Sequence, residues 1–282
     1  MSDVPVIADP AAMSAWSEAA RARGERIALV PSMGALHAGH VSLLAEARRR
    51  CQRVVLSIFV NPMQFGPQED LAKYPRDLPG DLAKAASVGC DLAFVPEAAG
   101  MFGPGYQTAI DVREVSQGLC GARRPGHFTG VATVVCKLFN IVRPRVAFFG
   151  EKDFQQLAVI RRMGTDLNLP VEIVGLPTVR EPDGLAMSSR NAYLSAADRT
   201  RATALFAGLS AAKTLAAKGE RRASVLLDAA TAEIAGRVDR IDYLEVRAAD
   251  DLAPLTTIDR PAVILVAAFV GRTRLIDNLR LA

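Results

Sequence analysis

Histidine, tryptophan and paired cysteines are all scarce in this chain. Only three histidines and one tryptophan occur among 282 residues. The four cysteines, Cys51, Cys90, Cys120 and Cys136, include no pair at C-x-x-C spacing, so neither a zinc ribbon nor a dithiol redox motif is indicated. We therefore expect free, buried thiols in a reducing compartment rather than a disulfide framework.

Long apolar runs and long basic blocks are also missing. The longest strongly apolar run, residues 262–270, is too short to span a bilayer. The first ten residues, "MSDVPVIADP", lack the basic and apolar regions of a signal peptide. The net charge is +4, but Lys and Arg are spread along the chain, which argues against a nucleic-acid partner. We expect a soluble cytoplasmic protein without membrane or nucleic-acid partners.

What the chain does contain is an alternation of short apolar runs and amphipathic stretches. The composition is globular, with 50% hydrophobic and 23% charged residues. Strands are predicted at residues 26–31, 54–60, 92–96, 146–150 and 171–177. Helices are predicted at residues 39–50, 79–88, 130–144 and 155–167. This alternation indicates an α/β fold with a doubly wound, Rossmann-like parallel sheet.

The pattern changes after about residue 178. Two Ala-rich helical stretches, 196–217 and 223–236, precede strand-like segments at 241–247 and 262–271. We therefore predict two domains, a Rossmann-like domain of residues 1–178 and a smaller α+β domain of residues 179–282.

Unusual polar motifs follow four of the predicted strands. They read "PSMGALHAGH", "NPMQF", "EKDFQQ" and "DGLAMSSRN". Because ligands of open α/β sheets bind beyond the carboxyl ends of the strands, the four motifs together predict one composite site.

The first motif suits a phosphate chain. Gly34 and Gly39 allow a tight turn and a close backbone approach, and a helix start offers free N–H groups. His37 and His40 are three residues apart, so they share a helix face and can both donate to phosphate. The alternative is a structural packing role. A zinc site of the H-E-x-x-H type is not indicated, because its spacing and its Glu are missing.

A family resemblance emerges from several motifs taken in order. The H-x-G-H pattern resembles the nucleotidyltransferase superfamily. With "SIFVNPMQF", "RPGHFTGVATVV", "FFGEKDFQQL" and "VREPDGLAMSSRNAYLS", nearly the whole chain resembles the pantoate–β-alanine ligase (pantothenate synthetase) family. The resemblance implies an ATP-dependent ligase that joins pantoate to β-alanine through a pantoyl-adenylate, releasing pyrophosphate and AMP. It also implies a homodimer, a first domain that binds ATP and pantoate, and a second domain that acts as a lid.

The resemblance also implies an ATP site. Its expected residues are Met33, Gly34, Ala35, Leu36, His37, Ala38, Gly39, His40, Gly150, Glu151, Lys152, Asp153, Val179, Met187, Ser188, Ser189 and Arg190. Among them His37, His40, Lys152 and Arg190 are the expected catalytic residues, with His40 as proton donor. Donors of this kind stabilise charge on phosphate oxygens. The alternatives are a surface position for Lys152 and a solvated loop for residues 188–190.

Pantoate recognition is assigned to amide side chains, because amides offer both donors and acceptors to hydroxyls. By resemblance, Gln64 and Gln156 hold pantoate, and Gln64 also lies near β-alanine. Asn61 is either a further substrate contact or the cap of its Asn-Pro turn. Arg124 and His127 are expected to engage an anionic group, with solvation as the alternative.

Three apolar side chains have two open interpretations. Met33, Phe59 and Phe65 either wall the pantoate methyl groups or pack in the core.

Mg²⁺ is the expected metal, with Asp81 as its ligand, directly or through water. Members of the family usually carry an acidic pair here, and this chain reads Gly80-Asp81. One carboxylate suffices when phosphates also coordinate Mg²⁺. The alternative is that Asp81 caps a helix.

Three other functions share some of these motifs: a nucleotidyltransferase with a dinucleotide-like product, a tRNA synthetase and a non-catalytic nucleotide-binding regulator. The paired glutamines argue against the nucleotidyltransferase. The missing K-M-S-K-S lysine argues against the tRNA synthetase. The density of polar motifs argues against the regulator.

Overall fold

A computed structural model describes residues 4–66 and 71–281. The larger sheet has six parallel strands in the order β1-β4-β3-β2-β5-β6. Their bounds are β1 (Val6–Ile7), β2 (Ile27–Ser32), β3 (Arg53–Ile58), β4 (Leu92–Phe94), β5 (Val146–Gly150) and β6 (Glu172–Leu176). From β2 the chain adds strands on one side, then crosses so that β5 pairs with β2 on the other. The strand order therefore reverses between β2 and β5, where doubly wound folds bind ligands.

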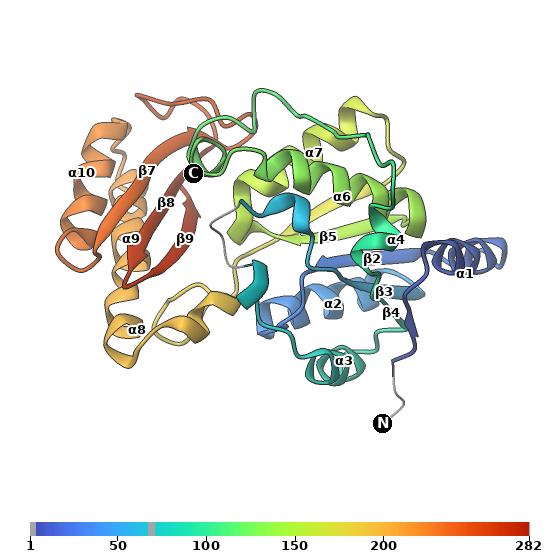
Figure 1. Ribbon diagram of the computed structural model, residues 1–282. Helices are drawn as coiled ribbons and strands as arrows, with labels where there is room; N and C mark the ends of the chain where they lie inside the picture. The colour runs from blue at the N-terminus through green and yellow to red at the C-terminus, as the bar shows by residue number, and fades with distance from the viewer. Residues whose placement is uncertain (1–3, 67–70, 282) are drawn as a thin grey trace.

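Helices cover both faces of this sheet (Figure 1). Helices α2 (Ala38–Arg50) and α3 (Leu78–Ala86) lie on one face, and α1 (Pro10–Ala22), α6 (His127–Val142) and α7 (Phe154–Asp166) on the other. Neighbouring strand residues join different cores. Val55 packs with the α6 face, and Leu56 with the α2 face. This period of two means that strands buried on both faces read as continuous apolar runs.

The smaller domain holds an antiparallel sheet of β7 (Arg240–Ala248), β8 (Ala262–Val270) and β9 (Thr273–Arg280), in that order. Helices α8 (Ala196–Ala202), α9 (Ala204–Ala217) and α10 (Ala223–Ile234) accompany it. One face of β8 packs on α9 and α10 through Ile264, Val266 and Ala268. The other face turns Val263 and Leu265 toward Phe154 of α7. The sheet is therefore buried on both sides, which explains the unbroken apolar run of β8.

Two short helices and four 3-10 turns complete the described chain. They are α4 (Ala98–Met101), α5 (Leu119–Arg123), η1 (Pro62–Gln64), η2 (Leu71–Lys73), η3 (Glu151–Asp153) and η4 (Ser189–Tyr193). Among the described residues, no helix combines the length and apolarity needed to cross a membrane.

Strand β9 contacts the segments that follow β5 and β6. The Asp277 carboxylate accepts hydrogen bonds of 2.7 and 2.9 Å from both terminal nitrogens of Arg180, which follows β6. Asn278 Nδ2 donates to the carbonyls of Glu151 and Lys152, each at 2.9 Å. Burial raises the pKa of Asp277, and the Arg180 guanidinium opposes that rise. The last strand thus holds the loops that follow β5 and β6.

The predicted fold class is confirmed, and the predicted strands and helices lie close to the observed ones. Three differences stand out. The predicted helix 196–217 divides at Thr203 into α8 and α9. Helix α6 begins at His127, so this residue lies in the helix rather than before it. Helix α1 and strands β1 and β9 were not predicted. The boundary near residue 178 stays a prediction.

The Arg180–Asp277 pair generates a stability prediction. We expect Arg180→Met to lower the free energy of unfolding by about 3–5 kcal/mol, because it strands a buried carboxylate. Arg143→Met is the matched control. Its ion pair with Glu18 has side chains 50% and 58% exposed, and such pairs contribute at most about 1 kcal/mol. Urea unfolding measures both, and equal effects would contradict the assigned role of β9.

Candidate active site

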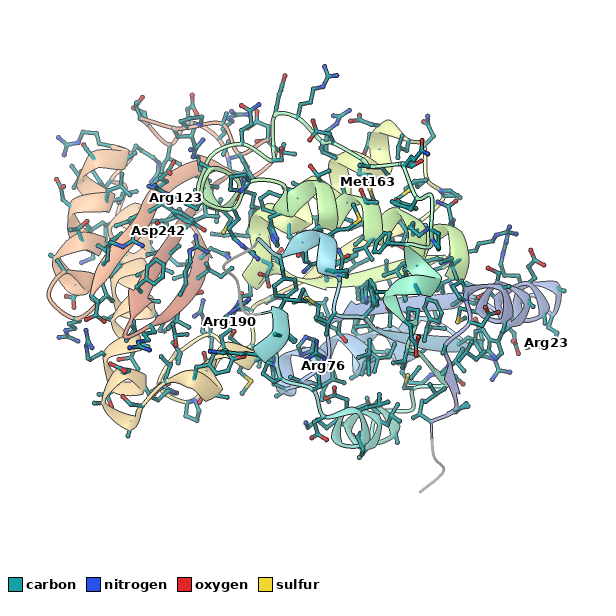
Figure 2. The ribbon with its side chains drawn as sticks, viewed as in Figure 1. Arg23, Arg76, Arg123, Met163, Arg190 and Asp242 are labelled. Carbon is teal, nitrogen blue, oxygen red and sulfur yellow. The ribbon has the colours of Figure 1, made fainter. Side chains whose placement is uncertain are left out.

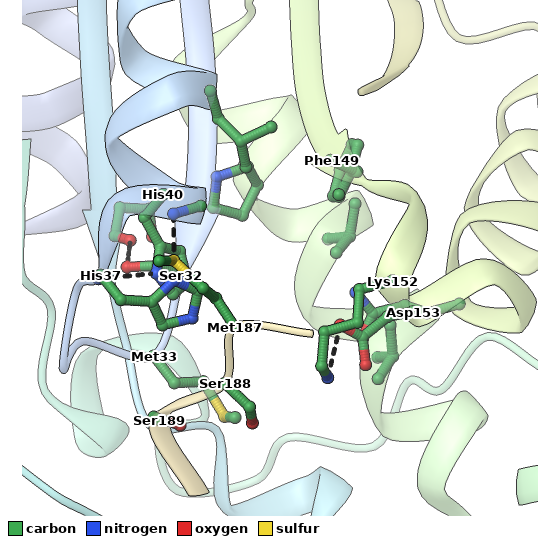
Figure 3. A pocket seen from close by; sticks show the side chains of 18 of the residues that line it. Ser32, Met33, His37, His40, Phe149, Lys152, Asp153, Met187, Ser188 and Ser189 are labelled. Atoms are coloured by element: carbon green, nitrogen blue, oxygen red, sulfur yellow. Dashed lines mark hydrogen bonds and ion pairs between the residues drawn. The ribbon is translucent and has the colours of Figure 1, made fainter. Parts of the chain in front are cut away.

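A central cavity of about 220 Å³ lies at the carboxyl ends of β2 and β5. Fourteen of the predicted site residues line it: Met33, His37, Gly39, His40, Gln64, Gly150, Lys152, Asp153, Gln156, Val179, Met187, Ser188, Ser189 and Arg190. They come from five separate stretches of sequence, and Figure 3 shows the histidines facing Lys152 across the cavity. The predicted composite site is therefore assembled by the fold.

The two histidines form a capping box at the start of α2, with His37 as the N-cap residue. Nδ1 of His37 accepts a hydrogen bond from the backbone N–H of Gly39 at 3.1 Å, and Nδ1 of His40 accepts from the N–H of His37 at 3.3 Å. A backbone N–H can only donate, so both Nδ1 atoms are unprotonated. In the neutral form, each ring therefore carries its proton on Nε2, which leaves one N–H donor per ring for a ligand.

Burial keeps both rings neutral in the ligand-free protein. It lowers the pKa of His37 to about 4, with Lys152 adding to the effect. It lowers the pKa of His40 to about 3, with the neighbouring His37 adding to the effect. At neutral pH the histidine pair therefore offers hydrogen-bond donors, and the full positive charges on the cavity wall belong to Lys152 and Arg190.

Lys152 lies just past β5, and its side chain is 18% exposed. Its Nζ is 3.8 Å from a carboxylate oxygen of Asp153, which also lines the cavity. Asn278 holds the carbonyl of Lys152, as described above. A partly buried lysine on a fixed turn is well placed to meet phosphate oxygens.

The segment 187–190 closes another side of the cavity. The N–H of Met187 donates to the carbonyl of Val179 at 3.0 Å. The Ser188 hydroxyl accepts from the N–H of Arg190 at 3.3 Å. The hydroxyls of Ser189 and Tyr74 are 3.3 Å apart. Tyr74 also lines the cavity, and sequence analysis missed it, because no recognisable motif surrounds this tyrosine.

Gln64 and Gln156 both line the cavity, whereas Asn61 does not. Asn61 is 1% exposed. It donates to the Gln64 side chain at 3.1 Å and to the carbonyl of Gly130 at 3.0 Å, and it accepts from Met63 N–H. Of the two interpretations of Asn61, the structure therefore supports the turn cap. A Cβ at Gly130 would lie 2.3 Å from the Met63 carbonyl oxygen, so glycine is needed for this close packing.

Arg124 and His127 line a second cavity of about 1100 Å³ between the two domains, which we name the interdomain cavity. Nδ1 of His127 donates to the Gln64 carbonyl at 2.9 Å, and Arg124 donates to the same carbonyl at 3.3 Å. Both residues thus hold the Gln64 turn in place. The two cavities share Lys152, Asp153, Gln156, Ser188 and Arg190. Contact of Arg124 and His127 with an anion stays a prediction.

The structure corrects one of the two interpretations of Asp81. Its carboxylate is 1% exposed, and it accepts hydrogen bonds from the N–H groups of Ala35 at 2.9 Å and Leu36 at 2.7 Å. It lies beneath the loop and does not line the cavity, and the cap of α3 is Asp77 rather than Asp81. The metal role of Asp81 stays a prediction. Ala35 has φ of 51° and Gly34 has φ of 89°, and Asp81 stabilises this left-handed turn.

Several predicted ATP residues lie behind the cavity. Leu36 belongs to the core on the α2 face, and Glu151 pairs with Arg280 at 2.8 Å. Gly34, Ala35 and Ala38 shape the backbone between β2 and α2 but do not line the cavity. Of the three apolar candidates, Met33 and Phe59 line it, and Phe65 packs against Tyr74 instead. Sequence position alone could not separate lining residues from supporting ones.

The described residues contain no group of three or more His, Cys, Asp and Glu placed to hold a metal ion. Among them, Asp153 is the only carboxylate lining the central cavity. Mg²⁺ bound to a triphosphate takes few protein carboxylates and keeps several waters. The donor set therefore fits a metal carried in by a nucleotide and met by Asp153, rather than a resident metal.

Comparison with known proteins agrees with this geometry. A sequence model of the pantoate–β-alanine ligase family matches residues 5–280. The chain belongs to the pantoate–β-alanine ligase family. The pantothenate synthetase of Myxococcus xanthus is 56% identical over 269 residues, which cover 94% of this chain and 92% of that protein. Membership in the family makes this chain a ligase, as the sequence motifs predicted.

Solved structures of the ligase family share the whole fold. The crystal structure of pantothenate synthetase from Thermus thermophilus has a TM-score of 0.93 and 44% identity, covering 98% of this chain and 99% of that one. The ligase of Francisella tularensis, complexed with beta-gamma ATP and β-alanine, has a TM-score of 0.83 and 31% identity, covering 99% and 98%.

The lowered histidine pKa values predict a specific loss of stability in acid. Between the usual value of about 6.5 and the folded values of about 4 and about 3, the unfolded chain binds protons that the folded chain does not. The free energy of unfolding therefore falls as pH drops through this window. Between pH 7 and pH 5, we expect the ligand-free wild type to lose about 3–4 kcal/mol more than a His37→Asn/His40→Gln variant, because each depressed imidazole contributes about half of that loss. Urea titrations at both pH values measure this, and parallel losses would contradict neutral, buried imidazoles.

The position of Asp81 yields a second prediction. Asp81→Asn keeps one acceptor but sets an NH₂ group against a backbone N–H, so we expect a loss of about 1–3 kcal/mol in unfolding free energy. The Mg²⁺ concentration for half-maximal activity should stay unchanged. The matched control is Asp77→Asn, because Asn also caps helices well. A rise in the Mg²⁺ requirement without a loss of stability would instead support the metal role of Asp81.

Proposed function

We propose that this ligase condenses pantoate with β-alanine at the expense of ATP, through a pantoyl-adenylate. The observation that carries the proposal is the convergence of His37, His40 and Lys152 with Gln64 and Gln156 on one cavity. Donors suited to phosphate and amides suited to hydroxyl groups therefore line the same cavity. Family membership supports the ligation, and the bound ATP and β-alanine of the Francisella tularensis ligase support the substrates.

In the first half-reaction, a carboxylate oxygen of pantoate bonds to the α-phosphorus of ATP, and the bond from that phosphorus to pyrophosphate breaks. Pantoate is already ionised at neutral pH, so the site must position it and stabilise charge. The Nε2–H groups of His37 and His40 and the Lys152 ammonium are suited to donate to phosphate oxygens. Bound Mg²⁺ would neutralise part of the triphosphate charge.

In the second half-reaction, the neutral amine of β-alanine attacks the acyl carbon, and the bond to AMP breaks. Neither His37 nor His40 is suited to take the amine proton, because Nδ1 of each ring already accepts a backbone N–H. Gln64 and Gln156 are proposed to hold the pantoate hydroxyls. The amides thus orient the acyl group while the histidines stay with the phosphate.

The smaller domain is proposed to act as a lid. Ser188 and Arg190 line both cavities, so a movement of their segment would change access to the triphosphate. A homodimer and a cytoplasmic location stay predictions from the family resemblance and the composition.

Isotope transfer tests the adenylate. With pantoate labelled by heavy oxygen in its carboxylate, we expect one labelled oxygen in AMP and none in pyrophosphate, because the carboxylate oxygen stays on phosphorus when the amide forms. Pyrophosphate should also appear with ATP and pantoate alone. Mass spectrometry of the products checks both. ADP and inorganic phosphate as products would reveal acyl-phosphate chemistry and contradict the proposal.

Substitutions in the same assay test the assigned donors. Lys152→Ala and His40→Ala should each slow adenylate formation by about 10²–10³, the effect of losing one preorganised donor to a charged transition state. Lys213→Ala, which removes an exposed lysine from α9, is the matched control and should leave the rate unchanged. Single-turnover rates near the parent value for both site variants would overturn the assignment.

A further inference from the structure

Three arginines surround one buried carboxylate on the wall of the interdomain cavity. Asp242 of β7 has a side chain 5% exposed. Nε and Nη2 of Arg274 each lie 2.9 Å from its Oδ2. Arg123 Nε and Arg240 Nη1 each lie 3.4 Å from its Oδ1. Figure 2 labels Arg123, from α5, close to Asp242 of the small sheet. We name Arg123, Arg240 and Arg274 the arginine cluster.

The cluster carries more positive charge than its own carboxylate can balance. Three guanidinium groups and one carboxylate leave a net charge of +2. Nearby acids do not supply the difference. Asp198 and Asp277 also line the cavity, but they pair with Arg201 and Arg180, which do not line it. Among the described residues, eight lysines and arginines and four aspartates line this cavity, so its wall is set up to receive an anion.

The guanidinium groups are also held in place before any ligand arrives. Arg240 stacks over the Phe269 ring at 4.4 Å. Arg123 donates to the backbone carbonyl of Asp242 at 3.0 Å. The side chains of Arg123 and Arg240 nevertheless remain 54% and 61% exposed, so part of their donor capacity faces solvent. Rigid forks of this kind match phosphate oxygens well and lose little entropy on binding.

We propose that the arginine cluster binds a phosphoryl oxyanion, pyrophosphate or inorganic phosphate, at a site separate from the central cavity. A dianionic phosphate matches the excess of two charges and a pyrophosphate more than balances it, whereas the single carboxylate of an amino acid would neutralise half of it. The shared residues Lys152, Ser188 and Arg190 connect the two cavities. The origin of the pyrophosphate, as the product leaving the catalytic site, rests on the proposed function; the binding itself does not.

A titration without turnover tests the site. The wild-type protein is saturated with α,β-methylene-ATP, which the proposed function assigns to the central cavity, and then titrated calorimetrically with pyrophosphate, inorganic phosphate or β-alanine. We expect pyrophosphate to bind under these conditions. An Arg123→Gln/Arg240→Gln variant should bind pyrophosphate at least about tenfold more weakly, because each charge-assisted hydrogen bond to an ion contributes strongly. Arg274 is left in place to balance Asp242.

Three controls make the outcome decisive. Arg237→Gln removes one exposed positive charge from the same domain, away from this cavity, and should leave pyrophosphate affinity unchanged. Arg123→Lys/Arg240→Lys keeps the charge and should recover part of the affinity. Thermal unfolding should show that the variants stay folded. Loss of pyrophosphate binding when the nucleotide analogue is present, equal affinity in the wild type and the Gln variant, or preferential β-alanine binding would each overturn the proposal.

The isotope experiment and this titration fail independently. If the adenylate route is wrong, pyrophosphate still binds the cluster in the titration. If the cluster does not bind it, label transfer from pantoate to AMP is unaffected.

Discussion

The hydrogen bonds that Asp277 and Asn278 make with the loops after β5 and β6 are the constraint on which the site depends. These two neighbours in β9 hold Arg180 and the carbonyls of Glu151 and Lys152. Lys152, the proposed catalytic lysine, therefore follows a strand of the large sheet and is positioned by a residue of the small sheet. Asn278 thereby ties the small sheet to the loop after β5, and the buried Arg180–Asp277 pair, which is costly to break, ties it to the segment after β6. A relative movement of the two domains would therefore displace Lys152 more directly than His37 and His40.

The electrostatics of the cavity follow from the same architecture. The fold places two neutral imidazoles on one wall, and Lys152 with Asp153 on the other. Neutral donors cost less to bury than cations do, so the histidines can sit at the helix start without a counter-charge. A polyanion entering this space would favour protonation of the rings, which links nucleotide binding to proton uptake in weakly acidic solution. The permanent positive charge in the site is therefore carried by partly exposed residues such as Lys152, and not by the buried histidines.

The sequence correctly indicated which polar residues follow the carboxyl ends of the strands. Strand-then-motif order placed His40, Lys152 and Gln156 correctly, because parallel topology brings those ends together. It did not reveal that Asp81 bonds to the backbone N–H groups of Ala35 and Leu36, because a polar side chain in a motif looks functional whatever its partners are. For Asn61 it left a turn cap and a substrate contact open, and the structure supports the cap. It also missed β9, because "TRLIDNL" shows no period-two alternation and four of its seven residues are polar or charged. In the structure, Asp277 and Asn278 bond to the segments after β6 and β5. Helix 196–217 looked continuous because nothing in its Ala-rich pattern marks the break at Thr203.

The buried Asp81 has a consequence for how this loop can be transplanted. The turn through Gly34 and Ala35 is held by a carboxylate from α3, more than forty residues away in the chain. The motif "PSMGALHAGH" therefore does not encode its own shape. Grafted onto another Rossmann-like sheet without a matching acid beneath it, the loop would be free to relax out of the left-handed conformation. His37 and His40 would then no longer face the same cavity, even though every residue of the motif was present. In this fold, the loop conformation depends on the motif and on Asp81 together.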